Sequence, residues 1–165
     1  MISTLNFIIV AGLLAILYGY IIGKQILSAS PGNIKMQEIA SAIQEGARAY
    51  LKRQYKTIAM VGIVILIIVT YALGVWVGLG YFIGAFLSGT AGYVGMLVSV
   101  QANVRTAEAS RKGLAAGLDM GFKSGAVTGM LVAGLALLSI AIYYLLLIKL
   151  NVENREIINA LVGLG

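Results

Sequence analysis

The chain has 165 residues, of which 60% are hydrophobic and 11% charged, whereas a soluble domain carries roughly 25% charged residues. It contains no Cys and no His, which excludes a thiolate nucleophile, a disulfide, a zinc cluster and an imidazole base. The net charge of +6 does not indicate nucleic-acid binding, because the combined aromatic and basic surface that such binding needs is missing.

Three long segments of the chain carry no charged residue at all. They are residues 1–23, 57–104 and 124–148, which hold 23, 48 and 25 residues. A water-soluble core of this size cannot hide so much uncharged chain, because small domains leave a large part of their surface wet. We therefore expect an all-α integral membrane protein.

The first uncharged segment predicts a membrane span over residues 5–27, since about 20 helical residues cross the roughly 30 Å of hydrocarbon in a bilayer. A cleaved signal peptide is the alternative. No positive charge precedes the apolar run, however, and Pro31 would follow the cut. We favour a retained helix.

The second uncharged segment is too long for one crossing, so it predicts two spans, over residues 57–77 and 82–104. The turn between them is indicated by Gly74, Gly78 and Gly80, with aromatic residues among them. The third segment predicts a fourth span.

That fourth span covers residues 124–148, and residues 157–165 look like the beginning of a fifth.

Basic residues gather in two of the connecting segments. Residues 24–56 hold six basic and two acidic residues, and residues 105–123, a predicted loop, hold four and two. The positive-inside rule places both segments in the cytoplasm and the N-terminus outside. Four aromatic residues then fall at the outer interface: Trp76, Tyr81, Tyr143 and Tyr144.

Residues 33–56 are predicted to form a cytoplasmic extension of the second spanning helix, with Ser30 or Asn33 as its cap. Its charged residues indicate either a solvated face or a face that packs on a catalytic lobe from chain outside this sequence. Its apolar residues recur at helical spacing: Met36, Ile39, Ala40, Ile43, Ala47, Tyr50 and Leu51.

Small residues recur every four positions, which predicts close helix packing in lipid. A phosphate-binding loop is not indicated, since no strand precedes the glycines. The rows are Gly113, Gly117, Gly121, Gly125, Gly129 and Ala133; Ala11, Ala15, Gly19 and Gly23; Gly84, Ser88 and Gly92; and Ala91, Gly95, Ser99 and Asn103.

No catalytic, cofactor-binding or metal-binding residue is predicted in this chain. Asp119 is its only aspartate, and its six acidic residues form no cluster that could hold magnesium. Ser99, Asn103 and Arg105 could line an ion path. They lie at the cytoplasmic end of a span, however, where Arg105 can extend to the interface, and we favour that interpretation.

Three segments are similar, in order and spacing, to the N-terminal helices of the membrane-bound, ion-translocating inorganic pyrophosphatases. They are residues 32–62, 82–110 and 113–138. Gln101 departs from the pattern, because family members often carry a basic residue there. The resemblance implies a many-helix, homodimeric enzyme that hydrolyses magnesium-bound pyrophosphate on the cytoplasmic side and pumps H⁺ or Na⁺ outward. Mg²⁺ is the implied cofactor, and K⁺ is a second candidate.

The family's substrate and gate residues lie on later helices, so no functional residue carries over to this chain, and we expect the chain alone to be inactive. We interpret it as the N-terminal scaffold portion of such a pump in a prokaryotic inner membrane, with the remaining helices as partners. The alternative is a small, non-catalytic helical membrane subunit that packs on a partner protein. An ion channel or carrier is less favoured, because no buried charge supports it.

Overall fold

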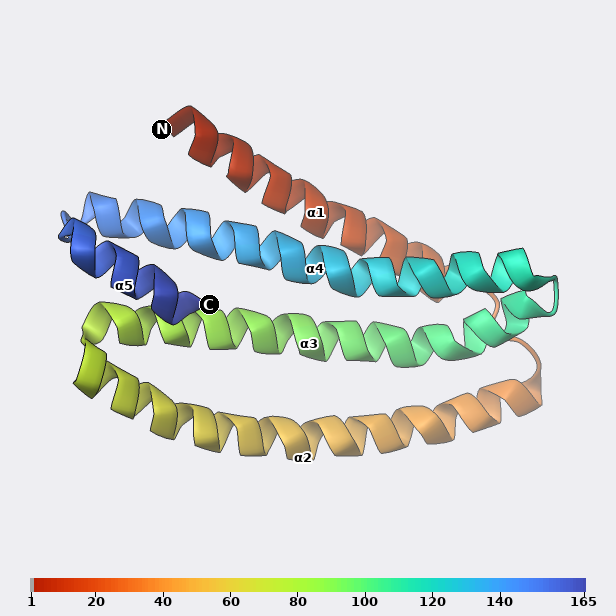
Figure 1. The fold of residues 1–165 in the computed structure, drawn as a ribbon. Coiled ribbons are helices and arrows are strands. Elements are labelled where there is room, and N and C mark those ends of the chain that lie inside the picture. The colour runs from red at the N-terminus through yellow and green to blue at the C-terminus, as the bar shows by residue number, and fades with distance from the viewer. Residues whose placement is uncertain (1) are drawn as a thin grey trace.

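The computed structural model describes residues 2–165, with side chains from Thr4 onward, and the described chain is helical throughout apart from short connections. The four long helices lie side by side in the order α1, α4, α3, α2, and the short α5 folds back against α3 and α4 (Figure 1). This confirms the all-α fold class. The helices are α1 (Ile2–Ser28), α2 (Ile34–Leu73), α3 (Val75–Ser110), α4 (Leu114–Lys149) and α5 (Asn154–Leu164).

Four of the helices are long and apolar enough to cross a membrane, and the protein is an integral, multi-pass membrane protein. α2 has 40 residues and α3 and α4 have 36 each. At about 1.5 Å per residue they measure roughly 54–60 Å, well above the roughly 30 Å of hydrocarbon. These three helices therefore project beyond the bilayer.

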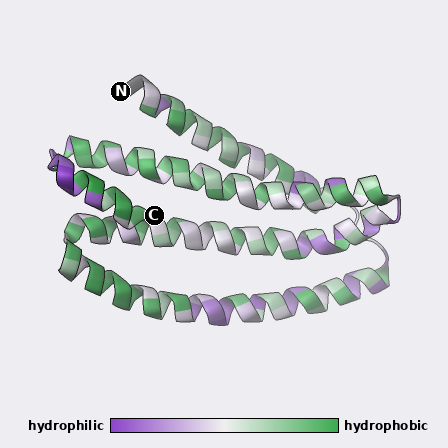
Figure 2. Cartoon of the chain, in the orientation of Figure 1, coloured by the Kyte–Doolittle hydropathy of each residue, from purple (hydrophilic) through white to green (hydrophobic). Residues whose placement is uncertain are grey.

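The projecting ends lie away from the turn that joins α2 to α3. Tyr143, near the end of α4, donates a hydrogen bond to the carbonyl oxygen of Trp76, at the start of α3, so these two helix ends share one level. Most charged residues of α2, α3 and α4 lie toward the opposite ends, in residues 35–56 and 105–123, so the excess length lies there. Hydrophilic residues gather along the N-terminal half of α2 and at the α3–α4 turn beside it, and also at the α4–α5 turn (Figure 2).

The prediction of a loop over residues 105–123 is wrong, because most of this segment is helical. α3 continues to Ser110 and α4 begins at Leu114, which leaves three residues between them. Gly113 takes a positive φ of 125°, a backbone conformation that favours glycine. The charges in this segment lie on the helical projections and on a tight turn.

The turn between α2 and α3 is also tighter than expected, because it needs Gly74 alone. Gly74 has a positive φ of 101°, which residues with a Cβ rarely adopt. Gly78 and Gly80 lie inside α3, where the absence of a side chain lets other elements approach. A Cβ at Gly78 would collide with Thr70, and one at Gly80 would collide with the carbonyl oxygen of Ala160.

The N-terminal half of α2 begins at a capped residue, since Asn33 Oδ1 accepts a hydrogen bond of 2.9 Å from the Met36 amide. The apolar residues of this half of α2 form two lines along the helix. Ala40 and Leu51 are buried, whereas more than half of the surface of Ile39, Ile43 and Tyr50 is exposed. Only the first line packs within this chain.

Buried side chains form a separate cluster toward each end of the bundle. One cluster joins α1, α3 and α4 through Ile22, Ile26, Ala102 and Val127. The other joins α4 to α5 through Tyr143, Leu147, Ile157 and Ala160. α2 contributes to neither cluster, and its spanning half is the most exposed part of the bundle.

Candidate functional site

The close contacts between helices occur where a glycine faces a neighbouring helix. A Cβ at Gly134 of α4 would lie 2.8 Å from the Gly12 carbonyl oxygen of α1, and one at Gly95 of α3 would lie 2.7 Å from Thr128 Cγ2. A Cβ at Gly84 would collide with the carbonyl oxygen of Leu164 in α5. These glycines therefore set the helix spacing, as expected for packing in lipid.

The close packing predicted for the five-glycine row, Gly113 to Gly129, is found only in part, because most of the row does not pack inside this chain. Gly117 approaches Ser110 closely, and a Cβ at Gly121 would make only ordinary contact with Thr106, at 3.8 Å. Nothing lies within 4 Å of a Cβ at Gly125 or Gly129. Those two glycines lie on an exposed face of α4.

Arg105 joins α3 to the end of α1. Its Nη2 donates to the carbonyl oxygen of Leu27 at 2.9 Å and its Nε to that of Ala29 at 3.2 Å, while Nη1 donates to Gln101 at 2.7 Å on its own helix. The last carbonyl groups of a helix lack intrahelical partners and carry partial negative charge, so a guanidinium group is well suited to them. The charge of Arg105 is thus engaged in a helix cap.

The other two residues of the suggested ion path lie elsewhere on α3. Ser99 is half-buried and Asn103 is exposed. Since Arg105 is directed to α1, the structure does not bring the three side chains together as a common polar site. Gln101 lines a small crevice of about 10 Å³ with Arg48 of α2.

The acidic residues of the described chain are dispersed. Asp119 pairs with Lys123 at 2.6 Å and Glu108 pairs with Arg111 at 3.1 Å, each within its own helix or turn. Among the residues that the structure describes, no three acidic side chains approach one another as metal ligands. The side chains present therefore do not fit a Mg²⁺ site, which needs several oxygen ligands around one ion.

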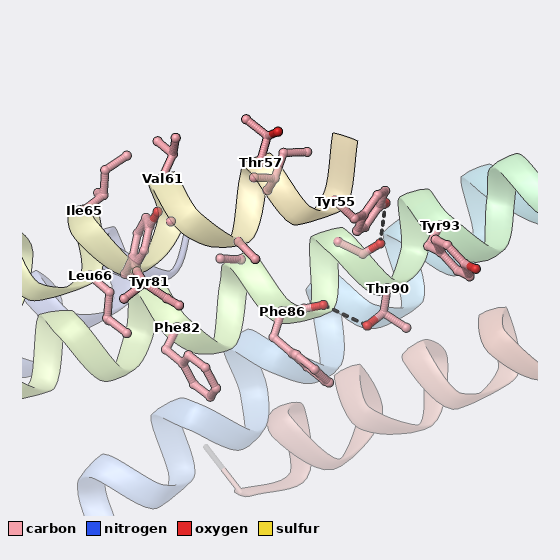
Figure 3. Close-up of a pocket in the computed structure, with 16 residues that line it drawn as sticks. Tyr55, Thr57, Val61, Ile65, Leu66, Tyr81, Phe82, Phe86, Thr90 and Tyr93 are labelled. Atoms are coloured by element: carbon pink, nitrogen blue, oxygen red, sulfur yellow. Dashed lines mark hydrogen bonds between the residues drawn. The ribbon is translucent and has the colours of Figure 1, made fainter. Parts of the chain in front are cut away.

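A large apolar groove of about 820 Å³ lies between α2 and α3. Tyr55 and Tyr93 lie toward one end of the labelled set, and Leu66 and Tyr81 lie toward the other (Figure 3). The Tyr55 hydroxyl donates to the carbonyl oxygen of Gly89 at 2.7 Å, and its ring meets that of Tyr93 edge to face at 5.3 Å. The sequence offered no signal for this groove, because apolar residues at membrane depth face lipid and protein alike.

Comparison with known proteins identifies the family. The chain matches the model of the family described as inorganic H⁺ pyrophosphatase over residues 13–165. It belongs to this family. The match extends beyond residues 32–138 in both directions, so it includes most of α1 and all of α5.

Three relatives within this pyrophosphatase family show how similar the chain is to its members. It is 46% identical over 138 residues to a K⁺-insensitive pyrophosphate-energized proton pump of Methanosarcina mazei, covering 82% of this chain. It is 44% identical over 144 residues to a putative K⁺-stimulated pyrophosphate-energized sodium pump of Bacteroides thetaiotaomicron, covering 84%. It is 36% identical over 177 residues to a K⁺-insensitive proton pump of Caldanaerobacter subterraneus subsp. tengcongensis, covering 95%.

The chain spans only a small share of these curated relatives, namely 21%, 20% and 25% of their lengths. The resemblance to membrane-bound pyrophosphatases that the sequence indicates is thus confirmed, and it concerns one part of a much longer kind of protein.

Proposed function

We propose that this chain is the N-terminal scaffold portion of a pyrophosphate-energised ion pump. The observation that carries the proposal is the family match over residues 13–165, together with 46% identity to a proton pump. In the complete protein, hydrolysis of magnesium-bound pyrophosphate to phosphate on the cytoplasmic side would drive H⁺ or Na⁺ outward. Both kinds of pump occur among the relatives.

The scaffold role is supported by the way the helices are joined. Glycine contacts set the spacing of α1, α3, α4 and α5, and the Arg105 side chain caps α1 from α3. Rigid helices of this kind can position catalytic side chains that other segments supply. Mg²⁺ would be held by those other segments, since the side chains described here do not fit it. The names of the relatives differ in K⁺ dependence, since one is called K⁺-insensitive and another K⁺-stimulated.

The proposal includes an assembly and a location. We infer a homodimer in a prokaryotic inner membrane, with the N-terminus outside and the charged projections in the cytoplasm. The excess of basic residues in residues 24–56 and 105–123 supports this orientation.

The decisive experiment compares residues 1–165 with the complete product of the same reading frame. Both are produced in membranes, and phosphate release from Mg²⁺-pyrophosphate is measured together with H⁺ or ²²Na⁺ movement into inverted vesicles. We expect hydrolysis and transport from the complete product and neither from residues 1–165. Hydrolysis by residues 1–165 would contradict the scaffold role.

A stop codon directly after Gly165 would contradict the larger proposal and favour the small, non-catalytic subunit. In that case the protein that copurifies with the chain identifies its partner. Asp-rich motifs on further downstream spans would support the pump.

A further inference from the structure

The groove between α2 and α3 is open at membrane depth, and its surface is almost entirely hydrocarbon. Several of the polar groups among its lining residues are hydrogen-bonded within the chain. The Tyr55 hydroxyl donates to Gly89, and Thr90 Oγ1 donates to the carbonyl oxygen of Phe86 at 2.8 Å. Ile58 and Val61, on the α2 side, are each about half exposed. An apolar occupant therefore fits the groove.

One end of the groove coincides with a membrane surface. Gly74, at the α2–α3 turn, lies 18 positions after Lys56, which corresponds to about 27 Å of helix and nearly matches the roughly 30 Å hydrocarbon thickness. Trp76 follows the turn, at the level that aromatic side chains favour. The Tyr55 end of the groove thus lies at the opposite interface, where headgroups are found.

Basic side chains continue one wall of the groove past that end. Lys52, Lys56, Ala59 and Ile63 are separated by four, three and four residues, so they form one stripe along α2. Ala59 and Ile63 line the groove, and Lys52 and Lys56 are exposed beyond it. A molecule that lies along this stripe would meet apolar side chains first and two ammonium groups next.

These two lysines lack an acidic partner in the described chain. No acidic residue occurs between Glu45 and Glu108. The two ion pairs among the described residues join Arg111 to Glu108 and Lys123 to Asp119, so neither includes Lys52 or Lys56. An apolar helix packed over this stripe would bury both charges without compensation, which is costly. A phosphate group would compensate them.

We propose that the groove binds an anionic phospholipid, with an acyl chain against Ala59 and Ile63 and the phosphate beside Lys52 and Lys56. A lysine extends its charge to the interface while its methylene groups stay on apolar surface. Attraction of anionic lipid is worth about 1 kcal/mol per basic residue near the surface, which corresponds to roughly a fivefold change in affinity for each lysine.

The proposal is tested on the complete protein, purified in detergent and stripped of lipid. Native mass spectrometry counts the bound molecules after addition of phosphatidylglycerol or phosphatidylcholine. We expect the unmodified protein to retain phosphatidylglycerol preferentially. The variant K52Q/K56Q should lose this preference, with affinity falling roughly 25-fold, the product of two fivefold effects. The control K35Q/K112Q removes two exposed lysines away from the groove and should keep it.

A second variant tests the apolar part of the site. Ala59→Phe fills the groove and should reduce retention of both lipids, with the helical circular dichroism signal unchanged. The proposal is overturned if the unmodified protein binds both lipids equally or neither, as it would if another helix occupied the groove. It is also overturned if K52Q/K56Q retains the preference, or if K35Q/K112Q loses it to the same extent.

Discussion

The Nη2 atom of Arg105 donates a hydrogen bond of 2.9 Å to the carbonyl oxygen of Leu27, 78 residues earlier in the chain. A second bond from the same guanidinium group reaches Ala29. The end of α1 is therefore held by a side chain of α3, with which α1 makes few other contacts. A residue that looks like an ordinary interfacial arginine in the sequence acts as the cap of another helix.

Replacing Arg105 with Gln should destabilise the chain by about 1–3 kcal/mol, because it removes charge-assisted hydrogen bonds to carbonyl groups that lack other partners. The free energy of unfolding in detergent micelles measures the effect. Arg111→Gln is the matched control: it breaks an exposed pair with Glu108 and should change stability by less than about 0.5 kcal/mol. Equal losses in the two variants would contradict the cap.

Gly134→Ala and Gly129→Ala should have opposite effects, although both glycines lie in the middle of α4. A Cβ at Gly134 meets the Gly12 carbonyl oxygen and Ile16 Cγ1 at 2.8 Å, so overpacking should cost about 1–3 kcal/mol. A Cβ at Gly129 meets nothing within 4 Å, and alanine has the higher helix propensity, so a gain of up to about 1 kcal/mol is expected. Unfolding of the isolated chain in micelles distinguishes them.

The same pair of variants in the complete protein tests whether a further helix covers this face of α4. If a helix outside this chain covers the exposed face of α4, Gly129→Ala should lower the stability of the complete protein although it raises that of residues 1–165. A gain of similar size in both would show that this face contacts lipid.

The sequence predicts the helices well because their length and lack of charge are imposed by the bilayer. It does not predict which face of a helix packs. In α4 the five-glycine row is more regular than the surroundings of Gly134, yet Gly134 makes the contact and Gly129 does not. Both faces of a spanning helix are apolar, so periodicity does not separate protein from lipid.

The projections were misjudged for a related reason. Charged residues over 105–123 indicate the end of the hydrocarbon region and therefore predict a loop there. Helix formation does not stop at a membrane surface, however, and α3 and α4 continue to Ser110 and from Leu114. The Arg105 cap depends on two segments meeting, which no local pattern reveals.

Tyr143→Phe should weaken the packing of α4 on α3 and α5. The Tyr143 hydroxyl donates to the Trp76 carbonyl oxygen in a mostly buried cluster. Its removal should cost about 1 kcal/mol, since that carbonyl group lies at the start of α3 and keeps its helical acceptor role. Tyr71→Phe removes a hydroxyl from a side chain that is 94% exposed and serves as the control. A loss of equal size in Tyr71→Phe would contradict the assignment.

The orientation across the membrane can be tested directly, because the chain has no Cys to interfere with labelling. Leu73→Cys places a thiol beside the Gly74 turn, and Lys112→Cys places one at the α3–α4 turn. In intact cells an impermeant maleimide should label the first and not the second, since the positive-inside rule predicts that the basic projections face the cytoplasm. After the membrane is permeabilised, both should react.

The reverse labelling would place the N-terminus inside and would contradict outward pumping from a cytoplasmic hydrolytic site. Both residues are exposed in the structure, so a difference between them in intact cells reports the side of the membrane rather than burial. The same measurement also shows in which leaflet the proposed lipid site lies. If the α3–α4 turn is cytoplasmic, Lys52 and Lys56 lie at the inner leaflet, where anionic headgroups give the surface its negative potential.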